Sequence, residues 1–176
     1  TAIRQMKSQG VGHIVMLTGD NAGTAQAVAR AVGIADVRAE LLPEDKLHAV
    51  EQLVNGAGPT AMIGDGINDA PALAAATLGI AMGADGSDAA VETADIALMS
   101  DDLSKIPWLI RHAQRTLRVI RQNIFFALGV KALFMALTFL NMATLWMAIA
   151  ADMGASLIVI FNAMRLLRFT EGRTAR

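Results

Sequence analysis

The strongest constraint on this chain is a long apolar stretch in its C-terminal part. Residues 1–102 carry most of the acidic side chains and have the composition of a water-soluble domain. A long stretch with few charges, by contrast, requires either lipid or a protein interior around it. We therefore expect two regions that fold in different solvents, a soluble domain and a membrane-type tail. Between residues 124 and 169, the only charged side chains are Lys131, Asp152, Arg165 and Arg168.

The overall composition excludes several classes of function. Hydrophobic residues make up 54% of the chain and charged residues 18%, whereas a soluble domain usually has about 25% charged residues. The net charge of −1 argues against a nucleic-acid binder that relies on a basic surface. Cysteine is absent, which excludes disulfides, thiolate metal sites and a cysteine nucleophile. The three histidines, His13, His48 and His112, are too scattered to predict a ligand cluster.

Residues 1–100 alternate between strand-like apolar runs and helix-like segments. This alternation predicts βαβ units and a mostly parallel sheet. Asn21 and Gly33 are typical start and stop signals of a helix, and Pro43 is typical of a first helical turn. The predicted strands are residues 11–17, 36–41, 60–63, 78–82 and 96–99, and the predicted helices are residues 22–32, 43–54, 68–76 and 87–93.

The rest of the chain divides into a stalk, two spans and a tail. Residues 101–122 predict an amphipathic stalk helix, because apolar residues recur every three or four positions and arginines occupy another face. The alternative is a helix that lies on the membrane surface. Residues 123–168 predict two transmembrane helices, at about 123–140 and 145–164, and residues 169–176 a tail. The alternative for the spans is a buried hairpin of a soluble protein.

Arginines lie at only one side of this predicted hairpin. The positive-inside rule makes that side cytosolic, so we expect both ends of the segment in the cytosol. The arginines before the first span are Arg111, Arg115, Arg118 and Arg121, and those after the second are Arg165, Arg168, Arg173 and Arg176.

The motif Gly-Asp-Gly-Ile-Asn-Asp-Ala-Pro occupies residues 64–71, directly after a predicted strand. Parallel sheets bind ligands at the carboxyl ends of their strands. Asp65 and Asp69 would converge there, and Mg²⁺ prefers carboxylate oxygens together with water and phosphate. Gly64 permits a close backbone approach to phosphate. A short Gly-Asp-Gly is commonly a simple turn, but the whole octapeptide after a strand favours a Mg²⁺ site.

A second polar motif, Thr18-Gly19-Asp20-Asn21, also follows a predicted strand. A hydroxyl and backbone amides at a helix N-terminus bind phosphate oxygens, although an ordinary helix cap is the alternative. Lys46 opens another predicted helix, where a solvent-exposed lysine is the alternative. Together with the two aspartates, these residues could hold a phosphoryl group and its metal. No Walker A loop is present, which excludes a P-loop NTPase.

Lys131 and Asp152 lie about 10 Å inside the two predicted spans, at similar depth because the helices are antiparallel. A charge at that depth costs at least about 2.5–3.5 kcal/mol and requires a partner or a function. One interpretation is an ion pair that merely holds the hairpin together. The other is an ion site in which Asp152 is a hard oxygen ligand and Lys131 its counter-charge. The several methionines of the spans are interpreted as lipid-facing residues rather than ligands of a soft metal.

The motifs MLTGDN, PEDK and GDGINDAPALAAA, followed by a stalk and two spans ending in NAMRLLR, resemble the P-type ATPases. The DMGAS motif, with a lysine in the preceding span, resembles the branch that exports zinc, cadmium and lead. The resemblance covers nearly the whole chain. It implies the C-terminal half of an α/β Rossmann-like phosphorylation domain of haloacid dehalogenase (HAD) type over residues 1–100, plus the stalk helix and a two-helix transmembrane hairpin.

In that family, ATP phosphorylates an aspartate of a DKTGT motif. The resemblance implies that Thr18 and Lys46 contact this aspartyl-phosphate and that Asp20 lies beside it. It also implies Mg²⁺ as cofactor, ATP as substrate of the complete enzyme, and Zn²⁺, Cd²⁺ or Pb²⁺ as cargo. The implied catalytic residues are Thr18, Gly19, Asp20 and Lys46; the Mg²⁺ residues are Asp65 and Asp69, supported by Asn68; the transport residues are Asp152 as ligand and Lys131 as counter-ion.

The chain also departs from the family pattern. It contains no DKTGT motif, nucleotide-binding domain or Cys-Pro-Cys span, so the nucleophilic aspartate is absent and covalent catalysis by this chain alone is excluded. We expect a C-terminal fragment, beginning at Thr1 rather than Met, of a multi-pass exporter in the plasma (inner) membrane. Its partners would be the lipid bilayer, a heavy-metal ion and the missing N-terminal part of the same pump. Part of the parallel sheet would then be missing.

Other functions remain open. The chain could be a membrane-anchored, catalytically dead phosphorylation domain that regulates or binds a full pump. It could belong to a copper-type or cobalt-type pump, although a Tyr-Asn pair and a C-terminal His-Glu pair are absent. A small HAD-type phosphatase is the least favoured reading, because its nucleophilic aspartate should open the domain.

Overall fold

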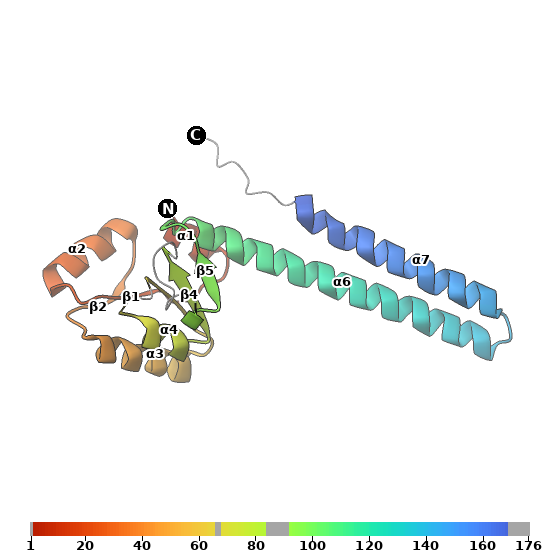
Figure 1. The fold of residues 1–176 in the computed structure, drawn as a ribbon, viewed down its shortest axis with the longest axis horizontal. Coiled ribbons are helices and arrows are strands. Elements are labelled where there is room, and N and C mark those ends of the chain that lie inside the picture. The colour runs from red at the N-terminus through yellow and green to blue at the C-terminus, as the bar shows by residue number, and fades with distance from the viewer. Residues whose placement is uncertain (1, 66–67, 84–91, 169–176) are drawn as a thin grey trace. The chain divides into compact units, whose positions relative to one another are not determined.

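The computed structural model describes residues 2–65, 68–83 and 92–168, which form two compact units, Thr1–Pro107 and Trp108–Arg176. Figure 1 labels the elements of both units. The predicted helix at residues 87–93 and the tail at 169–176 fall largely or wholly outside the described residues.

Unit 1 is an α/β domain whose described strands pair in parallel. β1 (Val15–Leu17) pairs with β2 (Asp36–Arg38), and β3 (Ala61–Gly64), β4 (Leu78–Met82) and β5 (Ile96–Leu98) form a second sheet in that order. The strands therefore form two parallel sheets of two and three strands. The Rossmann-like parallel arrangement agrees with the prediction from alternating strands and helices.

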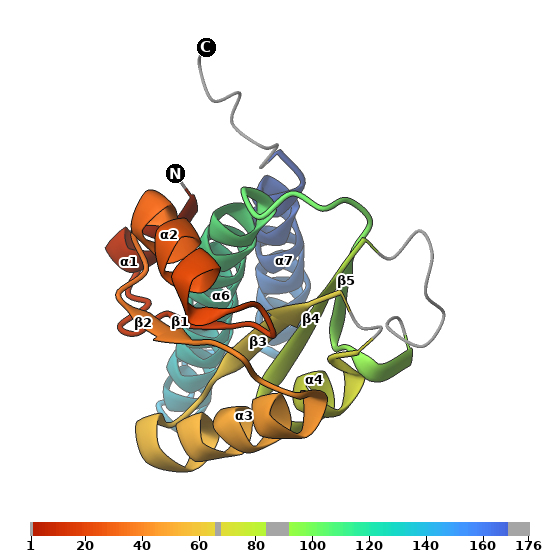
Figure 2. The same cartoon turned by 90° about the vertical axis from the view of Figure 1, so that its left-hand side faces the viewer.

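Helices cover these sheets on two sides. Figure 2 shows α3 (Pro43–Ala57) and α4 (Ala70–Ala75) along one side of the strands, with α1 (Ala2–Ser8) and α2 (Ala22–Val32) on the other. The α2 helix has the predicted bounds because both of its ends are capped. Asn21 Oδ1 accepts a hydrogen bond from the Thr24 backbone N–H at 2.9 Å, and Gly33 closes the helix with φ at +84°.

One apolar cluster joins the two sheets to the helices. Its buried members are Val50 of α3, Met62 of β3, and Ala72 and Leu73 of α4, and Leu17 of β1 packs against them. Because the cluster includes residues from both sheets, it fixes the end of β1 near the end of β3. These are the strand ends that precede the two polar motifs.

Unit 2 is a helical hairpin. α6 (Lys105–Phe139) is one continuous helix of 35 residues, and α7 (Leu145–Met164) follows a short turn and leads into the 3₁₀ helix η1 (Arg165–Arg168). The predicted stalk helix (residues 101–122) and the predicted first span (about residues 123–140) lie mostly within this one helix. The lengths and compositions of α6 and of residues 145–167 are sufficient to cross a membrane.

The start of α6 is held by a local turn. The Lys105 backbone N–H donates to the Asp102 carbonyl oxygen at 3.1 Å, and the Ser104 backbone N–H donates to Asp102 Oδ1 at 2.9 Å. Hydrogen bonds from the Ser104 side chain and backbone lower the pKa of the Asp102 carboxyl. The carboxylate therefore stays ionised at the positive end of the helix, where a negative charge is favourable.

Candidate functional site

The turn after β1 orients the first polar motif. Thr18 Oγ1 donates to Asp20 Oδ2 at 2.9 Å, and the Asp20 backbone N–H donates to Thr18 Oγ1 at 3.1 Å. The two side chains therefore hold each other in one conformation at the entrance to α2. A ligand at this turn would meet an oriented hydroxyl rather than a freely rotating one.

A neighbouring loop after β2 supports this turn and was not predicted from the sequence. The Glu40 backbone N–H donates to the Asp20 carbonyl oxygen at 2.9 Å, and Glu40 Oε1 accepts from the Ala22 backbone N–H at 3.3 Å. Glu40 has φ at +58°, a left-handed conformation that is uncommon for a residue other than glycine. Gly19 lies close to the same loop, since a Cβ there would be 3.3 Å from the Leu41 carbonyl oxygen.

The most definite contact of the site joins the second and third polar motifs. Lys46 Nζ, in the first turns of α3, lies 2.7 Å from Asp69 Oδ1, in the residue that precedes α4. Their side chains are 17% and 14% exposed, so solvent screens this pair less than a surface ion pair. The structure therefore removes the alternative that Lys46 is a solvent-exposed lysine.

Gly64 explains how Asp69 reaches this position. A Cβ on Gly64 would lie 3.0 Å from Asp69 Oδ2 and 3.1 Å from Asp69 Cβ, which is closer than ordinary van der Waals contact. The carboxylate of Asp69 therefore packs directly on the glycine backbone at the end of β3. The first glycine of the motif makes room for a side chain of the same motif, in addition to any ligand.

Asp65 and Asn68 lie on the surface beside this pair. Both are exposed, and residues 66 and 67 between them are outside the described residues. In the described parts of the chain, no group of three or more His, Cys, Asp or Glu side chains could by itself hold a metal ion. Mg²⁺ is usually bound by one or two protein carboxylates together with water and phosphate. Asp65 has the appropriate chemistry, whereas Asp69 already contacts Lys46.

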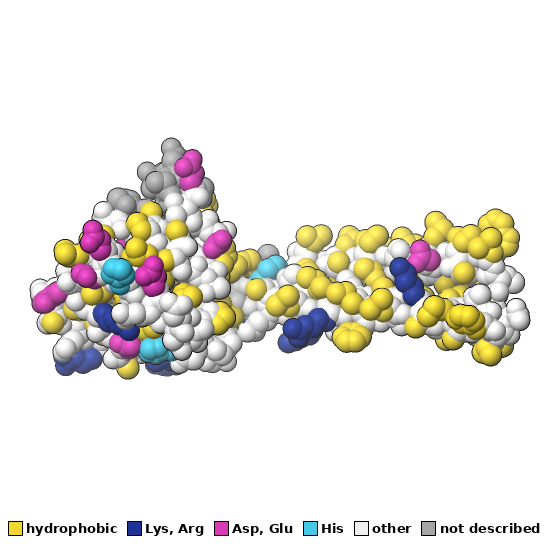
Figure 3. All heavy atoms as spheres, turned by 90° about the horizontal axis from the view of Figure 1, so that it is seen from below, with side chains coloured by type: hydrophobic (Ala, Val, Ile, Leu, Met, Phe, Trp, Pro, Cys, Tyr) yellow, Lys and Arg dark blue, Asp and Glu magenta, His cyan; other side chains and the backbone are white. Residues whose placement is uncertain are grey.

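The two charged residues of the spans are exposed in unit 2. Lys131 lies on α6 and Asp152 on α7. Within the described residues, no ion pair of 4 Å or less joins them. The interpretation of a tight ion pair that only holds the hairpin together therefore finds no contact in its favour. Figure 3 shows the difference in surface between the units: charged side chains are scattered over unit 1, whereas hydrophobic side chains are spread along this face of unit 2 with few charged ones among them.

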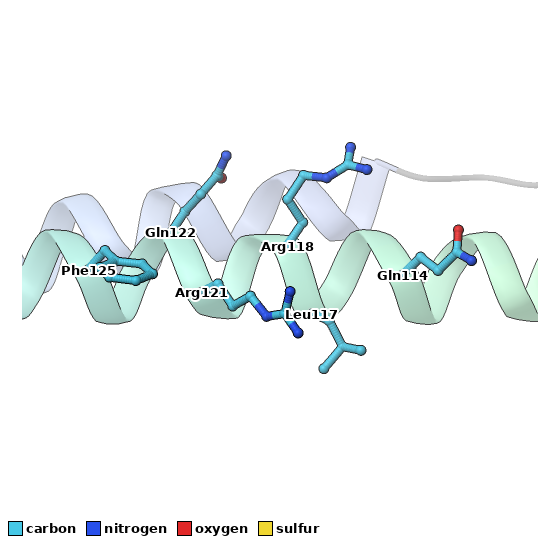
Figure 4. Close-up of a pocket in the computed structure, with 6 residues that line it drawn as sticks. All are labelled: Gln114, Leu117, Arg118, Arg121, Gln122 and Phe125. Atoms are coloured by element: carbon cyan, nitrogen blue, oxygen red, sulfur yellow. The ribbon is translucent and has the colours of Figure 1, made fainter. Parts of the chain in front are cut away.

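A surface hollow lies on α6, at the start of the apolar stretch rather than at the strand ends. Figure 4 shows the side chains that line it, all from this one helix. Arg121 extends between Leu117 and Phe125, whereas Arg118 points to the other side of the helix. Such a mixture of arginine and apolar side chains is typical of a helix that leaves an aqueous region for an apolar one. The lining residues are Gln114, Leu117, Arg118, Arg121, Gln122 and Phe125.

Comparison with known proteins gives the site its context. Residues 1–77 match the family model described as haloacid dehalogenase-like hydrolase. Over 169 residues, the chain is 51% identical to a probable cadmium-transporting ATPase of Staphylococcus aureus (strain MRSA252), covering 96% of this chain and 23% of that protein. It is also 51% identical over 170 residues to a cadmium, zinc and cobalt-transporting ATPase of Bacillus subtilis (strain 168), covering 95% of this chain and 24% of that protein.

A solved structure agrees along most of the chain. A zinc-transporting PIB-type ATPase in its E2.Pi state is 50% identical, with a TM-score of 0.86, and the match covers 95% of this chain and 27% of that one. The chain matches the heavy-metal P-type ATPases. It spans about a quarter of the length of these relatives. The likeness to P-type ATPases therefore extends through unit 1, α6 and α7, as the sequence motifs predict.

Proposed function

We propose that this chain supplies two parts of an ATP-driven exporter of zinc, cadmium or lead: half of the phosphorylation site and part of the metal pathway. The observation that carries the proposal is the 2.7 Å contact between Lys46 and Asp69, set against Gly64, in a chain half identical to cadmium- and zinc-transporting ATPases. An ion pair in this place positions a cation beside the strand ends where a phosphoryl group would lie.

In the phosphorylation site, each group of the chain has a separate role. The Thr18 hydroxyl, oriented by Asp20, would donate to an oxygen of an aspartyl-phosphate formed on another part of the pump. The Lys46 ammonium would stabilise the negative charge of that phosphate, because opposite charges attract strongly where solvent screening is low. Asp69 would hold Lys46 in place, and Gly19 would let the loop of Leu41 approach this turn closely.

Asp65 would hold Mg²⁺, with Asp69 and Asn68 arranging the same turn. Its position directly after β3 and its exposure suit a carboxylate that shares a cation with phosphate and water. When bound, Mg²⁺ supplies neutralisation of the charge on the phosphoryl oxygens. Removing the Asp65 charge should therefore affect phosphorylation without unfolding the domain.

In the membrane unit, Asp152 would be a ligand of the transported ion and Lys131 its counter-charge. Hard carboxylate oxygen is one of the ligand types that Zn²⁺ accepts. An ammonium at similar depth would replace the positive charge when the ion leaves, so that the carboxylate is never alone in an apolar region. The substrate range of zinc, cadmium and lead rests on the resemblance and on the names of the relatives.

The proposed topology places both ends of the segment in the cytosol, with the pump in the plasma (inner) membrane and in contact with lipid. Arg118 and Arg121 precede the apolar part of α6, and Arg165 follows α7. An excess of arginine at one side of a hairpin predicts that this side faces the cytosol. The missing N-terminal part of the same pump would supply the phosphorylated aspartate and the nucleotide site.

The proposal is tested most simply by Asp65→Asn in the full-length pump. We expect phosphoenzyme formation from ATP to fall by about 10²–10³-fold, because a charged group that acts on the phosphoryl transfer is lost. The matched control is Glu51→Gln, which makes the same chemical change on an exposed part of α3 that contacts only His48 among the described interactions. A normal phosphoenzyme level in Asp65→Asn would contradict the Mg²⁺ assignment.

A further inference from the structure

Two asparagines join the helices of the hairpin. Asn162 Nδ2 of α7 donates to Asn123 Oδ1 of α6 at 2.8 Å, and Asn123 Nδ2 donates to the Val159 carbonyl oxygen at 3.4 Å. On the other side of the pair, Arg165 Nη1 donates to Asn162 Oδ1 at 3.0 Å. Both asparagine side chains are half-buried, and neither was predicted as a functional residue from the sequence.

The direction of this pair is fixed by the groups at its two ends. A guanidinium only donates hydrogen bonds and a carbonyl oxygen only accepts them. Arg165 therefore requires the oxygen of Asn162 on its side, so the Asn162 amide nitrogen faces Asn123. Asn123 must then present its oxygen to Asn162 and its nitrogen to Val159. Each amide can satisfy its neighbours in one orientation only, which makes the two asparagines chemically unequal.

The pair also sets the register of the two helices. On α6, Lys131 lies eight residues after Asn123 (131 − 123). Because α7 runs in the opposite direction, the residue at the same depth on α7 lies eight residues before Asn162, at position 154 (162 − 8). Asp152 lies two residues further, a displacement of about 3 Å along the helix axis. The register that brings Asn123 and Asn162 together is therefore the register that places Lys131 and Asp152 at nearly the same depth.

A directional hydrogen bond fixes an axial alignment better than apolar contacts do. The facing surfaces of two apolar helices in lipid have little hydrophobic reason to prefer one axial alignment, whereas a directional hydrogen bond between helices has a single one. Two residues of axial slip correspond to about 3 Å, which is enough to separate the atoms of the asparagine pair beyond hydrogen-bond distance.

We propose that Asn123 and Asn162 are positioning residues that lock α6 and α7 in register and so keep Lys131 and Asp152 at a common depth. This rests on the proposed function of Lys131 and Asp152 in metal transport. The asparagines do not touch the transported ion, since about eight to ten helical residues separate them from the charged pair. They act on metal binding only through the axial position of Asp152 relative to Lys131.

The test uses two isosteric variants of the full-length pump, Asn162→Asp and Asn123→Asp. Asn162→Asp replaces the donor nitrogen by oxygen, so two oxygens face each other and the pair breaks. Asn123→Asp keeps the acceptor oxygen for Asn162 and adds the same charge, but it replaces the longer contact to the Val159 carbonyl by two facing oxygens. The measurement is the zinc concentration that half-maximally stimulates ATP hydrolysis, together with the maximal rate.

We expect Asn162→Asp to raise the half-maximal zinc concentration by about three- to tenfold, the range implied by one hydrogen bond between membrane helices. Asn123→Asp should raise it by about threefold or less, because the contact that it replaces is the longer of the two. The control is Gln122→Ala, a neighbouring exposed residue that has no contact with α7 among the interactions of the described residues. Loss of folding alone would lower the maximal rate and the yield without moving the half-maximal concentration.

Two outcomes overturn the inference. An unchanged half-maximal zinc concentration in Asn162→Asp, or an equal rise in both aspartate variants, contradicts a directional pair that sets the register. Asp152→Ala, measured in parallel, separates this failure from that of the proposed function. If Asp152→Ala abolishes zinc stimulation while Asn162→Asp behaves normally, the transport site stands and the positioning role does not. If Asp152→Ala retains zinc stimulation, the proposed transport site is contradicted. The positioning role of the asparagines, which rests on that site, then has no basis.

Discussion

The two units of this chain differ in how their lysine and aspartate side chains are arranged. In unit 1, Lys46 and Asp69 contact each other at 2.7 Å and are packed against the end of β3. In unit 2, Lys131 and Asp152 lie on apolar helices, and no ion pair joins them within the described residues. The interhelical polar contacts of unit 2 are made instead by the amides of Asn123 and Asn162.

This difference suits the two kinds of chemistry that we propose. A site for phosphoryl transfer gains from donors and charges that are held in place beforehand, because reorganisation during the reaction costs rate. A transport site must bind its ion and also release it, so a charge that is already tightly paired would compete with the ion. Neutral amides can align two helices without adding charge to the pathway, whereas charged pairs could not.

A substitution that displaces the Lys46–Asp69 pair of unit 1 should lower phosphoenzyme formation more than a substitution outside that pair. Gly64→Ala would place a Cβ 3.0 Å from Asp69 Oδ2 and 3.1 Å from Asp69 Cβ. Asp69 would have to move and would draw Lys46 away from its position. We expect phosphoenzyme formation from ATP to fall by about tenfold, since small displacements of positioning groups are costly.

Gly56→Ala is the matched control for that substitution. Gly56 lies in α3, and no heavy atom is found within 4 Å of a Cβ built there. An alanine in a helix is favoured over glycine by about 0.5–1 kcal/mol, so thermal stability should rise slightly and phosphorylation should stay unchanged. If both variants lose phosphorylation equally, the close packing of Gly64 on Asp69 is not what matters.

A smaller effect is expected at the helix cap beside the same site. Asn21→Ala removes the acceptor for the Thr24 backbone N–H and should destabilise α2 by about 1 kcal/mol. The measurement is the thermal unfolding midpoint of the purified pump, with Asn21→Asp as the variant that keeps an acceptor. Because Asn21 lies in unit 1, we expect the zinc dependence of ATP hydrolysis to be unaltered. A shifted zinc dependence would contradict a purely local effect of this cap on unit 1.

Some elements of the fold could be predicted because local signals specify them. The bounds of α2 follow from Asn21 and Gly33, which satisfy the free backbone groups at its two ends, and β4 follows from a short buried apolar run. The prediction of residues 11–17 as a strand was too long. β1 begins at Val15 because β2, its pairing partner, offers only three residues.

Other features depend on contacts between distant parts of the chain and leave no local pattern. The predicted stalk helix and the predicted first span form one helix, α6, because a helix can continue across a change of solvent when every residue can stay helical. The helix α1 was missed because its sequence is mostly polar and only Met6 is buried.

The sequence predicted the individual residues of the candidate site but not the contacts between those that are far apart in the chain. Motif spacing brings Thr18 next to Asp20, whereas the pairing of Lys46 with Asp69 joins residues 23 positions apart through the packing of two helices. The Asn123–Asn162 pair spans 39 positions. A signal for it does exist: an asparagine near the arginine-flanked end of each predicted span, at positions that face each other once the hairpin closes.

The measurement that tests the account most directly is zinc-stimulated ATP hydrolysis by the full-length pump carrying Asp152→Ala. The control is Met153→Leu, which alters the next residue of α7, a 65% exposed side chain, without changing charge. We expect Asp152→Ala to lose zinc stimulation and Met153→Leu to keep it, because the carboxylate is the proposed ligand. Retained stimulation in Asp152→Ala would show that the charges of unit 2 are structural and would contradict the division between a held phosphoryl site and an open transport site.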